Sequence, residues 1–198
     1  MKRYILSIVL ILSMVMLAGC NKNKAIVADD VKANTVLIKN DGTVQAATIE
    51  NFDKDYYNLE ELTTFINEKV NEYNQRNGAD SVVLGELKLI GANAVLVLNF
   101  KGLGHYNSFA DTNAVVTSTN SAKNGEITLP DTFLSAKDGA VISAAEALKN
   151  EKYKVLVVQE NTEVLVDGTV KYYTNGTLNG KSKIQTSTEG DTIVVYKP

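Results

Sequence analysis

Short runs of β-branched and aromatic residues, separated by turn-forming pairs, constrain the fold of this chain more than any other feature. Asn-Gly and Asp-Gly tolerate the positive φ angles of tight hairpins, and β-branched residues favour strands. In the last quarter of the chain this pattern predicts a C-terminal antiparallel meander. Its expected strands cover residues 153–158, 163–166, 169–173, 183–186 and 192–196.

The same signals predict two earlier hairpins. Residues 35–39 and 43–49 flank Asn40-Asp41-Gly42, and the apolar runs 82–90 and 94–100 flank a turn that begins at Gly91. Two further short strands are expected at 115–118 and 126–129, with Pro130 ending the second because proline has no backbone N–H to donate.

A long amphipathic helix is predicted between the two hairpins. Asn58 can cap it, Glu61 stands in capping-box position, and apolar residues recur every three or four positions up to Asn77. This spacing places both Phe65 and Ile66 on the expected buried face. Short helices are expected at 143–149 and within the loop-like stretch 102–113. The predicted fold class is therefore α+β, with β-hairpins and the C-terminal antiparallel meander packed against one long and one or two short helices.

The N-terminus has the features of a secretory signal. Lys2 and Arg3 precede an apolar run over residues 5–17, which is shorter than the roughly 20 residues of a membrane-spanning helix. The following Leu17-Ala18-Gly19-Cys20 resembles the lipobox of bacterial lipoproteins. The resemblance implies cleavage before Cys20, diacylglycerol on its thiol, and a location on the extracytoplasmic face of the cell membrane.

These signals divide the chain into a signal peptide (1–19), a lipidated cysteine with a tether (20–33), and a globular body (34–198). Length leaves open whether the body is one domain or two sub-domains at about 34–113 and 126–198. The lipobox, the NDGTV hairpin, the acidic start of the long helix and the C-terminal KYKVLVVQENTEVLVDGTVKYYTNG together resemble uncharacterised lipoproteins of Clostridia and related low-GC Gram-positive bacteria. That resemblance implies a cell-envelope protein and brings no activity, ligand or catalytic residue with it.

Composition excludes several classes of function. The 198 residues carry a formal net charge of −3, which argues against nucleic-acid binding because that needs clustered Lys and Arg. One Cys and one His cannot form a disulfide framework or a Cys/His zinc site within one chain. Gly102-Leu103-Gly104 lacks the remaining glycine and the context of a dinucleotide-binding loop, and no Walker-type lysine follows a glycine-rich loop. No cofactor is expected.

Two groups of residues are candidates for a site. His105, Tyr106 and Phe109 lie in a stretch with weak periodicity, where binding residues on a rigid scaffold tend to concentrate. The competing interpretation is a loop whose aromatic residues cover the sheet. Asp53 and Asp55 are candidates for a hard cation such as Ca²⁺, although acids near a helix start are also explained by the helix dipole.

Three classes of function follow. The favoured one is a non-catalytic, envelope-anchored binding or interaction module that contacts an envelope protein or a small ligand. An envelope hydrolase is the first alternative, but a Gly-x-Ser-x-Gly elbow is missing and the nearby triad candidates are only Ser108 and Asp111, which follow the single His. An accessory substrate-binding lipoprotein of a transporter is the second, although such receptors usually have two lobes. A deep pocket lined by titratable groups with perturbed pKa values would favour the enzyme. An exposed apolar patch or an open sheet edge would favour the interaction module.

Overall fold

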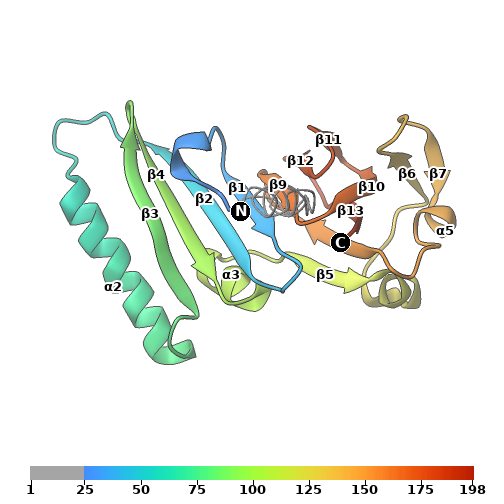
Figure 1. Cartoon of the computed structure of the whole chain (residues 1–198), viewed down its shortest axis with the longest axis horizontal. Coiled ribbons are helices and arrows are strands. Elements are labelled where there is room, and N and C mark those ends of the chain that lie inside the picture. The colour runs from blue at the N-terminus through green and yellow to red at the C-terminus, as the bar shows by residue number, and fades with distance from the viewer. Residues whose placement is uncertain (1–24) are drawn as a thin grey trace, which may run out of the picture.

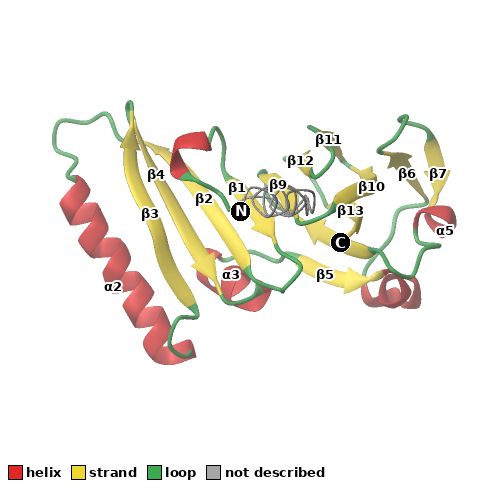
Figure 2. Ribbon diagram, in the orientation of Figure 1, coloured by secondary structure: helices red, strands yellow, loops and turns green. Residues whose placement is uncertain are grey.

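The computed structural model describes residues 25–198, which fold into two β-sheets with helices packed around them (Figures 1 and 2). The α+β prediction is confirmed. The expected signal peptide and Cys20 lie outside the described residues. From one edge to the other, the first sheet consists of β11 (Gly176–Leu178), β12 (Lys183–Thr186), β9 (Glu163–Val166), β1 (Thr35–Ile38), β2 (Val44–Asn51), β4 (Asn93–Phe100) and β3 (Val82–Ile90).

The second sheet has six strands, all paired antiparallel. In order they are β5 (Val115–Ser118), β8 (Lys154–Val158), β13 (Thr192–Lys197), β10 (Thr169–Thr174), β6 (Thr132–Ser135) and β7 (Val141–Ser143). The helical segments are η1 (Ala28–Asp30), α2 (Leu59–Asn77), α3 (Leu103–Ala110), α4 (Thr119–Ser121), η2 (Ala122–Glu126) and α5 (Ala144–Ala147). Within residues 25–198, no helix is both long enough and apolar enough to cross a bilayer.

Both predicted early hairpins are confirmed. The β1–β2 turn closes with the Lys39 amide donating to the Thr43 carbonyl, and Gly42 adopts a φ of +87° that few other residues tolerate. The Asp41 carboxylate accepts hydrogen bonds from the Thr43 hydroxyl and amide, which lowers the pKa of Asp41. The β3–β4 hairpin turns at Gly91, whose φ is +62°. Local turn chemistry therefore sets the register of both hairpins.

The C-terminal strands pair antiparallel as predicted, but the chain alternates between the two sheets. β9, β11 and β12 join the seven-stranded sheet, whereas β8, β10 and β13 join the other. β9 also pairs parallel with β1, with Val36 opposite Val164. The seven-stranded sheet thus contains strands from both of the stretches that the sequence offers as alternative sub-domains.

The strand predicted at residues 126–129 is wrong. The chain there is the end of η2 and a loop, and the strand begins after Pro130, at Thr132. β6 then pairs with β7 around a turn in which Gly139 has a φ of +73°. The sequence pattern does not predict this hairpin. The position of the strand is explained by Phe133, which is fully buried in a cluster with Val155 and Ile193. The apolar residues before Pro130 are only partly buried against that cluster.

The long helix α2 confirms the prediction at both ends. The Asn58 side chain accepts hydrogen bonds from the Glu60 and Glu61 amides at 2.8 and 3.2 Å, and the helix stops at Gly78, whose φ is +100°. Its buried residues Ile66, Val70 and Tyr73 face β3 and its neighbours. Figure 1 shows α2 lying alongside β3 at one end of the molecule.

Phe65 corrects one detail of that prediction, because its side chain is 55% exposed. Its position is rotated by about 100° from Ile66, so the two cannot share the centre of one face. The Lys69 ammonium lies 5.6 Å from the centre of the Phe65 ring. Phe65 is therefore a surface residue of α2.

We expect Ile66→Ala to lower the free energy of unfolding by about 2–5 kcal/mol, because it removes buried methyl groups from the core. Phe65→Ala should change it by no more than about 0.5 kcal/mol, as for other surface substitutions. Urea titrations of the two variants make the comparison. A larger loss for Phe65→Ala than for Ile66→Ala would contradict the orientation of α2.

One continuous core joins the two sheets. It contains Val36 and Val164 from the seven-stranded sheet, Leu156 and Val194 from the six-stranded sheet, and Tyr73 from α2. β8 is buried on both faces, since Val155 and Val157, the neighbours of Leu156, belong to a second cluster. The two sheets are therefore not separate hydrophobic units.

Part of the expected tether belongs to the folded body. Ala28 and Val31 are buried against Ala47, Val95 and Val97, on the opposite face of the seven-stranded sheet from α2. The Ala28 amide donates to the Glu86 carboxylate at 2.8 Å, and Asp29 pairs with Lys88 at 2.9 Å. From Ile26 onward the chain is held to the sheet.

Candidate functional site: a cleft between the sheet and α3

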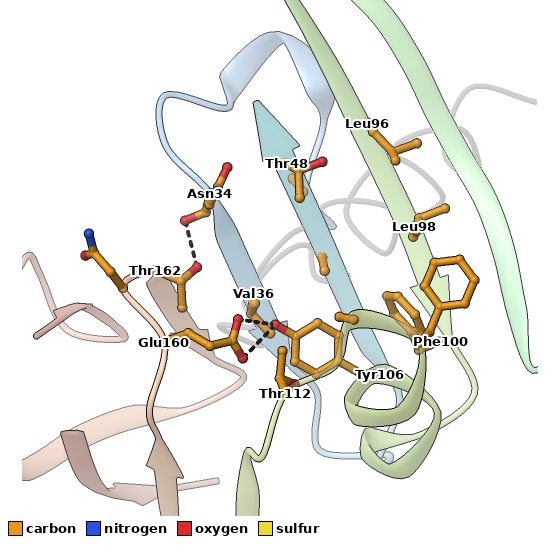
Figure 3. A pocket seen from close by; sticks show the side chains of 15 residues that line it. Asn34, Val36, Thr48, Leu96, Leu98, Phe100, Tyr106, Thr112, Glu160 and Thr162 are labelled. Atoms are coloured by element: carbon orange, nitrogen blue, oxygen red, sulfur yellow. Dashed lines mark hydrogen bonds between the residues drawn. The ribbon is translucent and has the colours of Figure 1, made fainter. Parts of the chain in front are cut away.

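A half-open cleft of about 350 Å³ lies on the α2 side of the seven-stranded sheet (Figure 3). Side chains on a strand alternate between faces, so positions two apart point into the same space. Leu96, Leu98 and Phe100 on β4, with Ala46 on β2 and Val36 on β1, therefore form its apolar floor. The volume lies at the lower end of the range for small-molecule sites.

One wall of the cleft is α3, which the sequence predicts only as a short helix. Phe109 and Tyr106 project from it, and Tyr106 is 3% exposed. The Tyr106 ring meets Phe100 edge to face at 5.3 Å, and Phe109 meets Tyr73 of α2 at 5.3 Å. These contacts fix α3 on the sheet.

Hydrogen bonds from Asn107 fix the chain after α3. Its side-chain nitrogen donates to the Ala114 carbonyl at 2.8 Å, and its oxygen accepts from the Ala114 amide and the Thr112 hydroxyl, both at 3.1 Å. Asp111 ends the helix in the left-handed conformation, with φ of 55°. The wall is therefore a well-supported element and not a loose loop.

The opposite wall is the connection Glu160-Asn161-Thr162, where the chain passes from β8 in one sheet to β9 in the other. Thr162 anchors it: its hydroxyl donates to the Asn34 carbonyl at 2.9 Å, and its amide donates to the Thr186 hydroxyl at 2.8 Å. Figure 3 shows this connection facing Leu96 and Leu98 across the cleft.

Tyr106 and Glu160 join the two walls. The Tyr106 hydroxyl donates to the Glu160 carboxylate oxygens, at 3.0 and 3.2 Å. Burial raises the pKa of Tyr106 far above its ordinary value, and the negative charge of Glu160 adds to the effect. The hydroxyl therefore stays protonated and acts as a hydrogen-bond donor at all physiological pH values.

The structure separates the three predicted binding residues. Tyr106 and Phe109 line the cleft, whereas His105 does not; its Nδ1 lies 3.3 Å from the Tyr73 hydroxyl. Tyr106 is also a core residue. It therefore both lines the cleft and covers the sheet, as the competing interpretation of these aromatic residues expects. Ser108 and Asp111, the partners of His105 in the hydrolase alternative, are both exposed and lie outside the cleft.

The two metal-ligand candidates lie elsewhere, in the exposed loop before α2. Asp53 forms an ion pair with the adjacent Lys54 at 3.5 Å, and Asp55 is exposed. Over residues 25–198, no group of three or more His, Cys, Asp or Glu side chains is arranged to hold a metal ion. The same loop carries Phe52 and Tyr57, stacked at 4.8 Å.

Sequence reasoning does not find Glu160 or Thr162. Gln159 to Asn161 read only as a polar break between two strands, and nothing in a local pattern indicates that this break faces Tyr106, 54 residues earlier. Comparison with known proteins adds nothing here: no family model, curated protein or solved structure matches the chain.

Proposed function

We propose that this protein is a non-catalytic binding module of the cell envelope, anchored to the extracytoplasmic face of the membrane through diacylglycerol on Cys20, and that it holds a small, largely apolar ligand in the cleft. The observation that carries the binding proposal is the cleft itself. It combines an apolar floor on β1, β2 and β4 with a few polar groups on its walls. Small-molecule sites commonly have this composition, because apolar area supplies affinity and a few polar groups fix orientation.

Binding is favoured over hydrolysis by the residues that surround the cleft. Those in the described chain include no serine, cysteine, histidine or lysine, and the cleft hydroxyl that donates to a carboxylate belongs to the buried Tyr106. Among the described residues that line the cleft, the one with a strongly shifted pKa is Tyr106, and its raised pKa makes the hydroxyl a poorer acid at neutral pH. A cleft residue with a shifted pKa favours an enzyme only where the shift makes proton transfer easier.

Filling the cleft tests this proposal. Ala46 is half-buried on the cleft floor, and Ala46→Phe places a ring in the open space while leaving the opposite face of β2 unchanged. Wild-type mature protein and the variant are incubated with small-molecule extract of the producing cells, washed and denatured, and the released compounds are identified by mass spectrometry. We expect at least one compound to be enriched by the wild type and reduced at least about tenfold by Ala46→Phe.

The control is Val141→Phe, at a position on β7 that is already 67% exposed and far from the cleft. It should retain the same compounds as the wild type. Equal recovery from Ala46→Phe, with the variant folded by circular dichroism, would place binding outside the cleft and overturn the proposal.

Anchoring is tested at the lipobox. We expect Cys20→Ala to abolish incorporation of labelled fatty acid, because its thiol is the proposed attachment point of the lipid. Cleavage before residue 20 should also be lost, so the variant keeps residues 1–19 and migrates as the larger precursor. Unchanged labelling and unchanged processing would show that Cys20 is not the anchor.

A further inference from the structure

We propose that the ligand of the cleft carries a protonated amine at one end of an apolar body, and that the Glu160 carboxylate receives that amine. The inference rests on the proposed binding function and adds the chemical class of the ligand. It follows from what surrounds Glu160, from the charge of the cleft, and from the positions of the apolar side chains.

The Glu160 carboxylate is under-used as a hydrogen-bond acceptor. Two carboxylate oxygens offer about four acceptor positions. In the described part of the chain, the Tyr106 hydroxyl is the donor that reaches them, and it approaches both oxygens with one hydrogen. Because Glu160 lines the cleft, a ligand bound there can donate to the remaining positions.

No basic side chain of residues 25–198 forms an ion pair with Glu160. The contrast is Glu163, three residues later, which pairs with Lys183 at 2.9 Å. Among residues 25–198, Glu160 is also the only charged residue that lines the cleft. A ligand that supplies a positive charge can therefore pair with this carboxylate through a charge-assisted hydrogen bond.

The apolar side chains give the direction of the ligand. Figure 3 shows Glu160 and Tyr106 together on one side, and Leu96 and Leu98 across the floor from them. An amine bound at Glu160 therefore directs the rest of the ligand over Val36 and Ala46 toward these leucines.

The same arrangement disfavours other head groups. A carboxylate or phosphate would approach Glu160 with like charge, and no lysine or arginine of the described residues lines the cleft to offset the repulsion. An alcohol can donate one hydrogen bond but brings no charge. The order of affinity is therefore expected to be ammonium, then alcohol, then carboxylate.

The test uses three probes that differ only in the head group: n-hexylammonium, 1-hexanol and hexanoate. Binding to the mature protein at neutral pH is followed by NMR titration of the methyl groups of Val36, Leu96 and Leu98. In the wild type we expect hexylammonium to bind about tenfold more tightly than hexanol, because a charge-assisted hydrogen bond is about twice as strong as a neutral one. Hexanoate should bind most weakly.

Two variants separate the role of Glu160 from net charge. Glu160→Gln keeps the size of the side chain and an acceptor for Tyr106, so it should fold and should bind hexylammonium and hexanol equally. Glu151→Gln removes the same charge from an exposed position at the other end of β8 and should keep the wild-type preference.

Each outcome has a distinct meaning. Equal binding of all three probes by the wild type, or an ammonium preference that survives Glu160→Gln, overturns the amine proposal and leaves the cleft as a binding site. If none of the three probes shifts the methyl resonances of the cleft, both the amine proposal and the proposed function fail.

Discussion

Tyr106→Ala should lower the free energy of unfolding by about 3–5 kcal/mol, one of the largest effects expected of a single substitution in this chain. Tyr106 is 3% exposed, lies against Phe100, and donates a hydrogen bond to Glu160 across the cleft. Truncation removes the ring from the core and leaves the carboxylate without that donor. Urea titration followed by circular dichroism measures the change.

Two further variants separate the contribution of the Tyr106 hydroxyl from that of its ring and provide a surface control. Tyr106→Phe keeps the ring and removes only the hydroxyl, so we expect a loss of about 1–3 kcal/mol. Ser108→Ala, on the exposed side of α3, should stay within about 0.5 kcal/mol of the wild type. If Tyr106→Ala behaved like Ser108→Ala, α3 would not be packed on the sheet, and the cleft would lose its wall.

Leu156→Ala should also destabilise the whole body, by about 3–5 kcal/mol. Leu156 lies on β8 of the six-stranded sheet, is fully buried, and belongs to the cluster that contains Val36 and Val164 of the other sheet. Because the core is shared, unfolding of one sheet should remove packing from the other. We therefore expect one cooperative transition, shifted to lower urea concentration.

Hydrogen exchange locates that effect. Amides of β1 and β2 should lose protection in Leu156→Ala together with those of β8, whereas Val141→Ala, at an exposed position, should leave all three unchanged. Protection lost only in the six-stranded sheet, or two separate transitions, would show that the body consists of two independent sub-domains.

Local chemistry explains why much of the fold is predictable from the sequence. The β1–β2 and β3–β4 hairpins depend on turns at Asn40-Asp41-Gly42 and Gly91, and α2 depends on the Asn58 cap and on apolar spacing. Each of these signals acts within a few residues. Phe65 shows the limit, because spacing alone does not decide which of two adjacent apolar residues, Phe65 or Ile66, faces the core.

Long-range pairing explains why the site is only half predictable. Tyr106 and Phe109 stand out in the sequence as aromatics in a weakly periodic stretch. Glu160 comes to Tyr106 only because β9 pairs parallel with β1, while β8 belongs to the other sheet. No turn signal or periodicity reports that crossing, and β9 reads equally well as a strand of a simple meander. His105 contacts Tyr73 and not the cleft, because α2 packs beside α3. This is also a long-range contact that local sequence patterns do not indicate.

Intermolecular nuclear Overhauser effects from a bound n-hexyl probe test directly whether the cleft binds a small apolar ligand. We expect contacts from the probe to the methyl groups of Val36, Leu96 and Leu98 and to the ring of Phe109, all of which line the cleft. Contacts confined to exposed apolar residues outside it, such as Val83, Leu89 or Val141, would show that the probe does not bind in the cleft.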